Sequence, residues 1–164
     1  MKLLVGLGGN QGDVRAAFAL AAQAIGERFA LLAASSLWRT APQGPPQPDF
    51  LNATLVIGLD VHPLQALAFF RQLEAAAGRE RTERWGPRPL DLDLLLVEDL
   101  VIASPALTLP HPQVADRRFV LLPAAEVAGS WQHPRLHRSI AELAGAAAPA
   151  GQECERLGEF PGWR

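Results

Sequence analysis

The chain has little of several residue types that would otherwise define its class. Cys154 is the only cysteine, which excludes an internal disulfide and any zinc site built from cysteines. No apolar run approaches the roughly 20 residues of a membrane-spanning helix, which predicts no association with a membrane. The apolar run that ends at Gly6 is too short for a signal peptide, and we therefore expect a cytoplasmic protein.

The chain also lacks an excess of charge of either sign. Its formal net charge is −2 at pH 7, and 49% of its residues are hydrophobic. Domains that bind nucleic acid generally have a pI above about 9, so this balance predicts no nucleic-acid partner. A chain of 164 residues can bury roughly two thirds of its unfolded surface, and we expect one globular domain over residues 1–164. Its small size and the lack of an evident apolar seam lead us to expect a monomer.

The order of apolar runs, helix caps and turn residues predicts an α+β fold. The expected strands lie at 2–7, 29–38, 50–60 and 90–97, and the expected helices between them at 14–28 and 62–77. This βαββαβ order is that of the ferredoxin-like fold, which implies an antiparallel sheet with helices against one face. Two further helices are expected at 119–127 and 139–147, and the tail at 151–164 is expected to lie on the surface.

Two aspartates interrupt the last core strand. Residues two apart on a strand share a face, so Asp91 and Asp93 project together, while the alternating leucines from Leu90 to Leu96 face the core. A buried carboxylate requires a partner, and two of them suit Mg²⁺, which keeps waters and substrate phosphates in its other positions. The pair can hold one ion or share two ions about 3.5–4 Å apart. The alternative is a solvated strand face whose aspartates pair with Arg84 or Arg88.

That preceding loop is rich in arginine. Its four arginines are Arg79, Arg81, Arg84 and Arg88. Guanidinium groups bind phosphate oxygens in bidentate geometry, and phosphoryl transfer requires mainly positioning and charge neutralisation. Glu80 and Glu83 lie among the arginines, so a salt-bridged surface loop is the alternative. Beside the aspartate pair, we favour phosphate binding.

Two loops are long for a compact domain, and loops of this kind are usually functional. The loop at 39–49 holds four prolines and Gly44, and the loop at 79–89 holds a Gly-Pro turn. Trp85 lies in the second loop, where so large an apolar side chain can close over a flat ligand or pack back as a plug. We expect both loops to move and to close over a bound substrate.

The glycine-rich turn at 6–12 does not match a nucleotide-binding motif. A dinucleotide fingerprint requires Gly-x-Gly-x-x-Gly, and Gln11 stands at the position of the last glycine. The turn also lacks the lysine of a P-loop. We interpret it as a tight connection from a strand to a helix whose N-cap is Asp13.

Several segments in one order carry a family resemblance. They are Gly-Leu-Gly-Gly-Asn at 6–10, Ser-Ser-Leu-Trp-Arg-Thr-Ala-Pro at 35–42, Gln-Pro-Asp-Phe-Leu-Asn at 47–52, Glu-Arg-Trp-Gly-Pro-Arg-Pro-Leu-Asp-Leu-Asp at 83–93, Leu-Pro-His-Pro at 109–112 and Asp-Arg-Arg-Phe-Val-Leu-Leu-Pro at 116–123. With these segments the chain closely resembles the 6-hydroxymethyl-7,8-dihydropterin pyrophosphokinases of folate biosynthesis. The resemblance covers residues 1 to about 128, and the block at 83–93 is its most specific part.

The resemblance implies transfer of pyrophosphate from ATP to the pterin hydroxymethyl group, with release of AMP. It implies catalytic roles for Arg79, Arg81, Arg88, Asp91 and Asp93, with two Mg²⁺ ions on the two aspartates. It implies that ATP is bound by Glu74, Arg79, Arg81, Trp85, Arg88, Leu94, Thr108, His111 and Arg117. It implies that the pterin is bound by Thr40, Ala41, Gln43, Phe50, Asn52, Trp85 and Phe119. Whether Arg79 or Arg81 is the main phosphate ligand stays open, and no residue is nominated as a base.

These implied roles agree with the chemistry of the ligands. A pterin is a flat heteroaromatic with a donor–acceptor edge, so two aromatic rings, Phe50 and Phe119, and the amide of Asn52 suit it. The rival hypothesis is a ferredoxin-like module that binds RNA or a nucleotide without turnover. Asp91 and Asp93 would repel phosphate in the absence of metal, and the chain is net acidic, so we favour the enzyme.

Overall fold

A computed structural model describes residues 1–80, 85–146 and 151–163 of the chain. Its strands are β1 (Lys2–Gly9), β2 (Ala30–Ala34), β3 (Leu37–Thr40), β4 (Phe50–Gly58), β5 (Asp91–Val97), β6 (Ile102–Ala103), β7 (Thr108–Leu109) and β8 (Cys154–Gly158). Its helices are α1 (Val14–Arg28), α2 (Pro63–Ala76), α3 (Arg118–Ala128) and α4 (Ile140–Gly145). None of the helices in this described part is long and apolar enough to cross a membrane.

The main sheet has the ferredoxin-like order. Its strands run β5-β1-β4-β3-β8, with β2 also paired to β4, and every pairing in it is antiparallel. The core order is therefore β1-α1-β2/β3-β4-α2-β5, with the first strand in the middle of the sheet beside the last. The predicted α+β fold class is confirmed.

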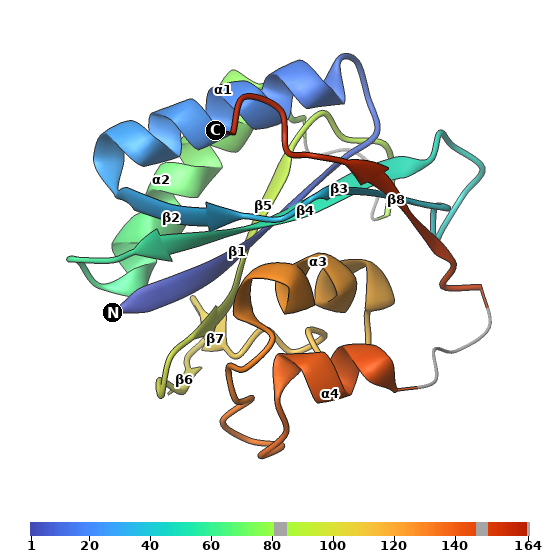
Figure 1. Ribbon diagram of the computed structural model, residues 1–164. Coiled ribbons are helices and arrows are strands. Elements are labelled where there is room, and N and C mark those ends of the chain that lie inside the picture. The colour runs from blue at the N-terminus through green and yellow to red at the C-terminus, as the bar shows by residue number, and fades with distance from the viewer. Residues whose placement is uncertain (81–84, 147–150, 164) are drawn as a thin grey trace.

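Helices cover both faces of the sheet (Figure 1), so the expectation of helices against one face holds only for α1 and α2, and α3 and α4 cover the other face. On the face toward α1 and α2, Phe18, Ile25 and Phe70 are fully buried against alternate residues of the central strands. On the opposite face, a smaller cluster contains Leu4 of β1 and packs under α3 and α4, with Leu121 inside it. Because successive residues of β1 point to opposite faces of the sheet, this one strand contributes side chains to both hydrophobic clusters.

Local capping explains where three of the helices begin. The Asp13 carboxylate accepts a hydrogen bond from the Ala16 N–H at 3.0 Å, which confirms the predicted N-cap of α1. His62 caps α2, with Pro63 in the first turn, and Ser139 forms a capping box at α4. Helix α3 differs, because Arg117 stands at its N-cap and makes no side-chain cap.

A β-bulge divides β5 into two parts. Leu94 lies opposite Val5 and Leu96 opposite Leu4, so β5 has one extra residue between these pairs. Leu92 and Leu94 pack in the larger core, whereas Leu96 packs on the other face. The prediction that all the alternating leucines share one face is therefore wrong for Leu96.

The single strand predicted at 29–38 is two strands. Ser35 interrupts it, because the Ser35 N–H donates to the Thr54 carbonyl and the Ser35 hydroxyl accepts from the Thr54 N–H, both at 2.9 Å. The Ser36 N–H and hydroxyl then donate to the Glu126 carboxylate of α3. These contacts redirect the chain from β2 to β3.

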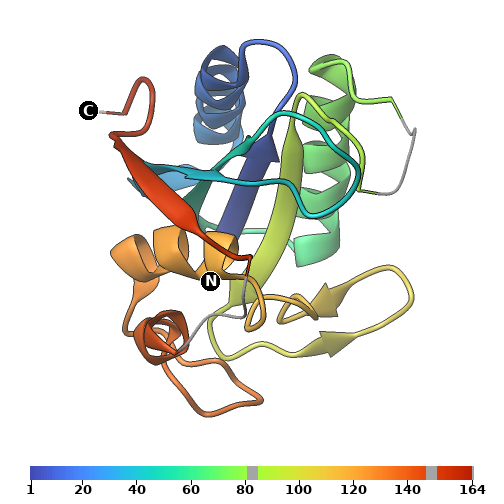
Figure 2. The same cartoon turned by 90° about the vertical axis from the view of Figure 1, so that its right-hand side faces the viewer.

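The tail is part of the fold. Strand β8 pairs with β3 at the edge of the sheet, and Phe160 is buried with its ring stacked on Phe18 at 6.1 Å between centroids. In Figure 2, β8 (red) runs along this edge above α3 (orange). The prediction of a tail that only lies on the surface is wrong, because its apolar residue completes the core.

Candidate active site

One cavity gathers most of the residues singled out from the sequence. Its volume is about 360 Å³, and it lies where β1, β4 and β5 meet the two loops and the start of α3. The predicted site residues that line it are Thr40, Ala41, Gln43, Phe50, Asn52, Arg79, Trp85, Arg88, Asp91, Asp93, His111, Arg117 and Phe119. These residues come from segments far apart in the chain, and folding alone brings them together.

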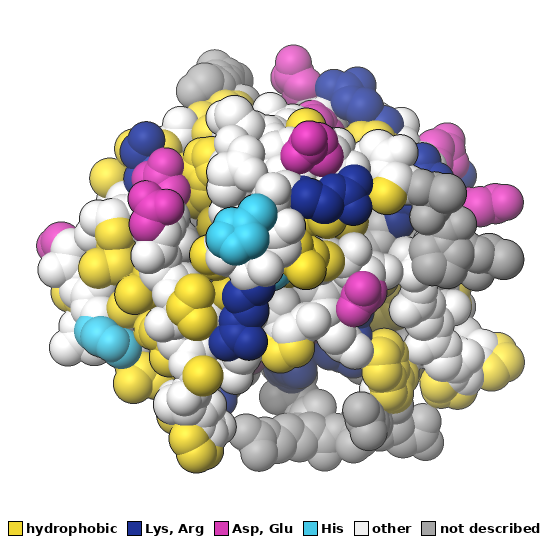
Figure 3. Space-filling view, turned by 90° about the horizontal axis from the view of Figure 1, so that it is seen from below, with side chains coloured by type: hydrophobic (Ala, Val, Ile, Leu, Met, Phe, Trp, Pro, Cys, Tyr) yellow, Lys and Arg dark blue, Asp and Glu magenta, His cyan; other side chains and the backbone are white. Residues whose placement is uncertain are grey.

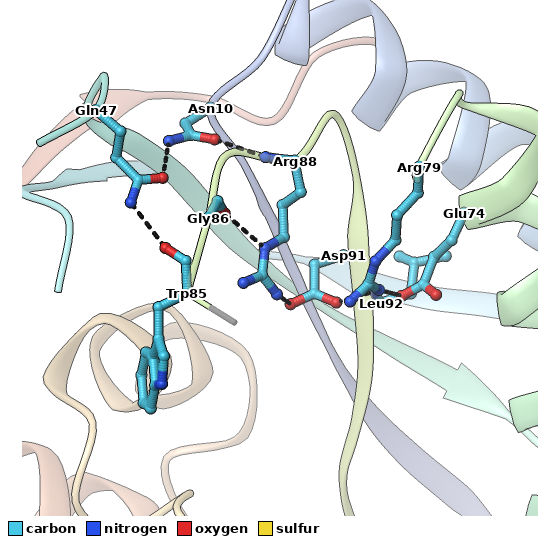
Figure 4. A network of polar contacts seen from close by, with 9 residues as sticks. All are labelled: Asn10, Gln47, Glu74, Arg79, Trp85, Gly86, Arg88, Asp91 and Leu92. Carbon is cyan, nitrogen blue, oxygen red and sulfur yellow. Dashed lines mark hydrogen bonds and ion pairs between the residues drawn. The ribbon is translucent and has the colours of Figure 1, made fainter. Parts of the chain in front are cut away.

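Asp91 lies in a network of ion pairs (Figure 4). Its Oδ1 is 2.7 Å from Arg79 and its Oδ2 is 3.0 Å from Arg88. The Arg79 guanidinium also lies 2.6 Å from Glu74, whose carboxylate accepts the Leu92 N–H at 2.8 Å. Burial raises the pKa of Glu74. The alternative in which the aspartates pair with a loop arginine thus holds for Asp91.

Asp93 has no such pair. It lies on the same face of β5 as Asp91, as predicted, and its side chain has no hydrogen bond or ion pair with any residue that the structure describes. Burial, reinforced by the charges of Asp91 and Glu74, raises the pKa of Asp93 to about 7. A buried carboxylate without a partner is energetically costly, so Asp93 is suited to bind a cation.

The donor set of this site fits Mg²⁺ rather than a metal held by protein ligands alone. In the described ranges no group of three or more His, Cys, Asp or Glu residues is placed to hold a metal ion. Two carboxylates on one strand face therefore leave most coordination positions to water and phosphate. This is the manner in which Mg²⁺ is usually bound beside a nucleotide.

Asn10 ties the two loops together (Figure 4). Its Oδ1 accepts the Arg88 N–H at 2.9 Å, and its Nδ2 donates to Gln47 and to the Pro48 carbonyl, both at 2.9 Å. Gln47 in turn donates to the Trp85 carbonyl at 2.7 Å. Asn10 was not predicted as a site residue, because the glycine-rich turn was interpreted as a structural connection alone. The signal was present, because Asn10 belongs to the first of the family segments.

Two aromatic residues line opposite walls of the cavity. Phe50 projects from β4 in the sheet, and Phe119 projects from α3, which covers that sheet. Between them, Asn52 Nδ2 and Thr54 Oγ1 are buried and have no hydrogen-bond partner within the described part of the chain. Unpartnered buried polar atoms are uncommon and indicate a place for a ligand. Thr54 was not predicted, although it lies two residues from Asn52 and so on the same face.

Arg117 lies at the mouth of the cavity. Its guanidinium carbon lies 5.3 Å from the Trp85 ring centroid and 5.7 Å from that of Phe119, both within the range of a cation–π contact. Nearby, the His111 N–H donates to the Leu95 carbonyl at 2.7 Å, and burial lowers the pKa of His111. These residues place a permanent positive charge and a neutral imidazole beside the aspartates.

The remaining predicted residues lie elsewhere. Glu74 lines a second cavity, of about 530 Å³, which shares Arg79, Asp91 and Asp93 with the first. Leu94 is 3% exposed in the core and lines neither cavity, and neither does Thr108 on β7. Arg81 lies outside the described residues.

Comparisons with known proteins agree with this geometry. Residues 4–129 match the sequence model of the 7,8-dihydro-6-hydroxymethylpterin-pyrophosphokinase (HPPK) family. A protein of Synechocystis is 40% identical over 142 residues, which cover 85% of this chain and 73% of the relative. One from Pseudomonas aeruginosa is 36% identical over 156 residues, covering 93% and 95%. Both are named 2-amino-4-hydroxy-6-hydroxymethyldihydropteridine pyrophosphokinase.

A solved structure supports the fold. The crystal structure of Plasmodium falciparum HPPK-DHPS aligns with 87% of this chain at a TM-score of 0.68. The sequence identity is only 12%, and this chain spans 44% of that longer one. The likeness therefore concerns the fold of that part alone. Since the family match covers residues 4–129 and the relatives align over most of their own length, the chain belongs to the HPPK family.

Proposed function

We propose that this protein transfers pyrophosphate from ATP to the hydroxymethyl group of 6-hydroxymethyl-7,8-dihydropterin and releases AMP. One observation carries the proposal. Among the described residues, Asp93 has no ion pair and the Asn52 amide nitrogen has no hydrogen-bond partner, and both lie in one cavity with two aromatic walls. A site suited to a metal ion and phosphates therefore lies beside a site suited to a flat heterocycle. The names of the relatives agree with this activity.

At the phosphate end, arginines supply the charge. Arg79 and Arg88 border the cavity from the second loop, and Arg117 borders it from the start of α3. Their guanidinium groups would bind the ATP phosphates and neutralise charge as the β-phosphorus is attacked. His111 would add a hydrogen bond. The second cavity, beside Glu74, is the place for the adenosine, and the roles of Arg81, Leu94 and Thr108 stay predictions.

Asp91 and Asp93 would hold two Mg²⁺ ions together with the ATP phosphates. When bound, the ions supply Lewis-acid polarisation of the phosphoryl oxygens and a template for the two substrates. The protein contributes the rigid strand that holds both carboxylates on one face. It also leaves Asp93 without an ion pair among the described residues, which favours occupation by a metal.

At the pterin end, the chain provides orientation. Phe50 and Phe119 would stack on the two faces of the ring, and the Asn52 amide would bind its edge. Thr40, Ala41 and Gln43 would form the rim, with Trp85 covering the opening. Holding the hydroxyl in line with the β-phosphorus is the main contribution that such a site makes to the rate.

The test is the nucleotide product. With ATP, Mg²⁺ and the hydroxymethyl pterin, we expect AMP and the pyrophosphorylated pterin in equal amounts. ADP as the only nucleotide product would refute pyrophosphoryl transfer. We also expect Asp93→Ala to abolish turnover while its circular dichroism and cooperative unfolding stay intact, and retained turnover would place the metal elsewhere.

A second measurement separates the enzyme from a module that binds RNA. On the face shown in Figure 3, Lys and Arg side chains are scattered among acidic and uncharged ones rather than gathered in one large patch. Such a surface suits bulk binding of nucleic acid poorly. Trp85 fluorescence should change on addition of an unreactive ATP analogue only when Mg²⁺ is present. A response to RNA that needs no magnesium would favour the module.

A further inference from the structure

Helix α3 begins without a cap of its own. The first N–H groups of a helix have no partner inside the helix and are usually satisfied by an acceptor side chain at the N-cap. Arg117 occupies that position, and a guanidinium has no acceptor atom. The acceptor comes instead from the tail, because the Arg118 N–H donates to the Gln152 side-chain oxygen at 2.8 Å.

The same amide also binds the chain before Arg117. Gln152 Nε2 donates to the Asp116 carbonyl at 3.0 Å. One side chain therefore holds the backbone on both sides of Arg117, with its acceptor on one flank and its donor on the other. Arg117 and Phe119, which line the cavity, project from the segment held in this way.

The tail is anchored to the opposite side of the cavity. The Thr40 hydroxyl donates to the Glu153 carbonyl at 3.2 Å, next to Gln152, and Thr40 pairs with Cys154 where β3 meets β8. The far end of the tail is fixed by the burial of Phe160. Residues 152–154 therefore join the rim formed by Thr40 to the wall formed by α3.

We infer that Gln152 is a positioning residue for substrate binding, because it holds the segment from which Arg117 and Phe119 line the cavity. This role lies outside residues 4–129, the range that the family model matches. Gln152 sets the distance between the wall that carries Arg117 and Phe119 and the sheet that carries Phe50. The inference rests on the proposed function for the identity of the substrates.

The variant Gln152→Ala tests the inference. We expect KM for the pterin and for ATP to rise about 3–10-fold, the effect of losing one or two hydrogen bonds, while kcat falls less than about twofold. Gln152→Glu keeps the acceptor for Arg118 and loses the donor to Asp116, so its KM values should lie between. Arg156→Ala is the matched control, because this exposed residue of β8 makes no side-chain hydrogen bond or ion pair with the described residues. It should keep both KM values.

If Gln152→Ala leaves both KM values unchanged and lowers kcat only in proportion to the fraction of unfolded protein, then Gln152 has a purely structural role. That result would overturn the inference. Equal effects of Gln152→Ala and Arg156→Ala would overturn it too. Amide hydrogen exchange tests the hydrogen bonds of Gln152 independently of activity. The Arg118 amide should exchange about 3–10-fold faster in Gln152→Ala than in the wild type. If the wild type makes no AMP, the proposed function fails. Hydrogen exchange at Arg118 and the affinity for an ATP analogue then still decide whether Gln152 positions the wall that carries Arg117 and Phe119.

Discussion

Replacing Asp93 by asparagine should stabilise the metal-free protein at alkaline pH. The folded chain raises the pKa of this carboxyl from an ordinary value of 3.8 to about 7, through burial and the charges of Asp91 and Glu74. The folded state therefore binds a proton that the unfolded state has already lost between these two pH values. The free energy of unfolding therefore falls as the pH rises from about 4 to about 7. Above pH 7 it stays at this lowered value.

The size of this effect follows from the two pKa values. Their difference corresponds to at most about 4 kcal/mol, at about 1.4 kcal/mol per pH unit. Asp93 is partly accessible to solvent, so we expect about 1–3 kcal/mol. Asparagine is nearly isosteric and carries no charge, and Asp93→Asn should recover this amount at pH 8 and almost none near pH 4.

Urea unfolding in the presence of a chelator measures the prediction, with both proteins compared at pH 4.5 and pH 8. Asp91→Asn is the matched control on the same strand face. Asp91 is paired with Arg79 and Arg88, so its loss leaves two arginines facing each other and should not stabilise the protein. A gain for Asp93→Asn that does not depend on pH, or an equal gain for Asp91→Asn, would refute the electrostatic explanation.

Two further variants probe the loops and the cavity floor. Asn10→Ala removes the acceptor of the half-buried Arg88 N–H and the donor to the Gln47 side-chain oxygen, and should lower the free energy of unfolding by about 1–3 kcal/mol and kcat/KM by at least about tenfold. Loss of stability with unchanged kcat/KM would show that the link between the loops does not serve the site. Thr54→Val removes a buried hydroxyl that has no partner in the described chain, so the ligand-free protein should gain up to about 1 kcal/mol. Its KM for the pterin should rise, and an unchanged KM would mean that this hydroxyl does not face the ligand.

The parts of the site that the sequence predicts are those with local signals. Asp91 and Asp93 share a face because alternation holds along any regular strand, and it fails only beyond the bulge, at Leu96. The arginine loop and the aromatic positions were accessible through the family segments. The site residues that were not predicted have partners distant in the chain. Asn10 is an example, because its amide contacts Gln47 and Arg88 only in the folded protein.

The tail escaped prediction for the same physical reason. A five-residue edge strand with exposed and half-buried residues has no clear periodicity, and its pairing with β3 is fixed by contacts more than 110 residues apart, such as the one between Thr40 and Glu153. The break at Ser35 likewise depends on Thr54 and, through Ser36, on Glu126. Such long-range hydrogen bonds leave no mark on local composition.

The bridging of Asp91 by Arg79 and Arg88 has a consequence for how the substrates enter. In the free protein these arginines act as internal counter-ions for the acid that a metal would bind. A metal ion that arrives alone must displace both arginines from Asp91, which leaves Arg79 with Glu74 only and Arg88 without this anion. A metal ion that arrives with a triphosphate brings new anionic partners for both arginines. The nucleotide and the cation should therefore bind synergistically, each raising the affinity for the other by the same factor.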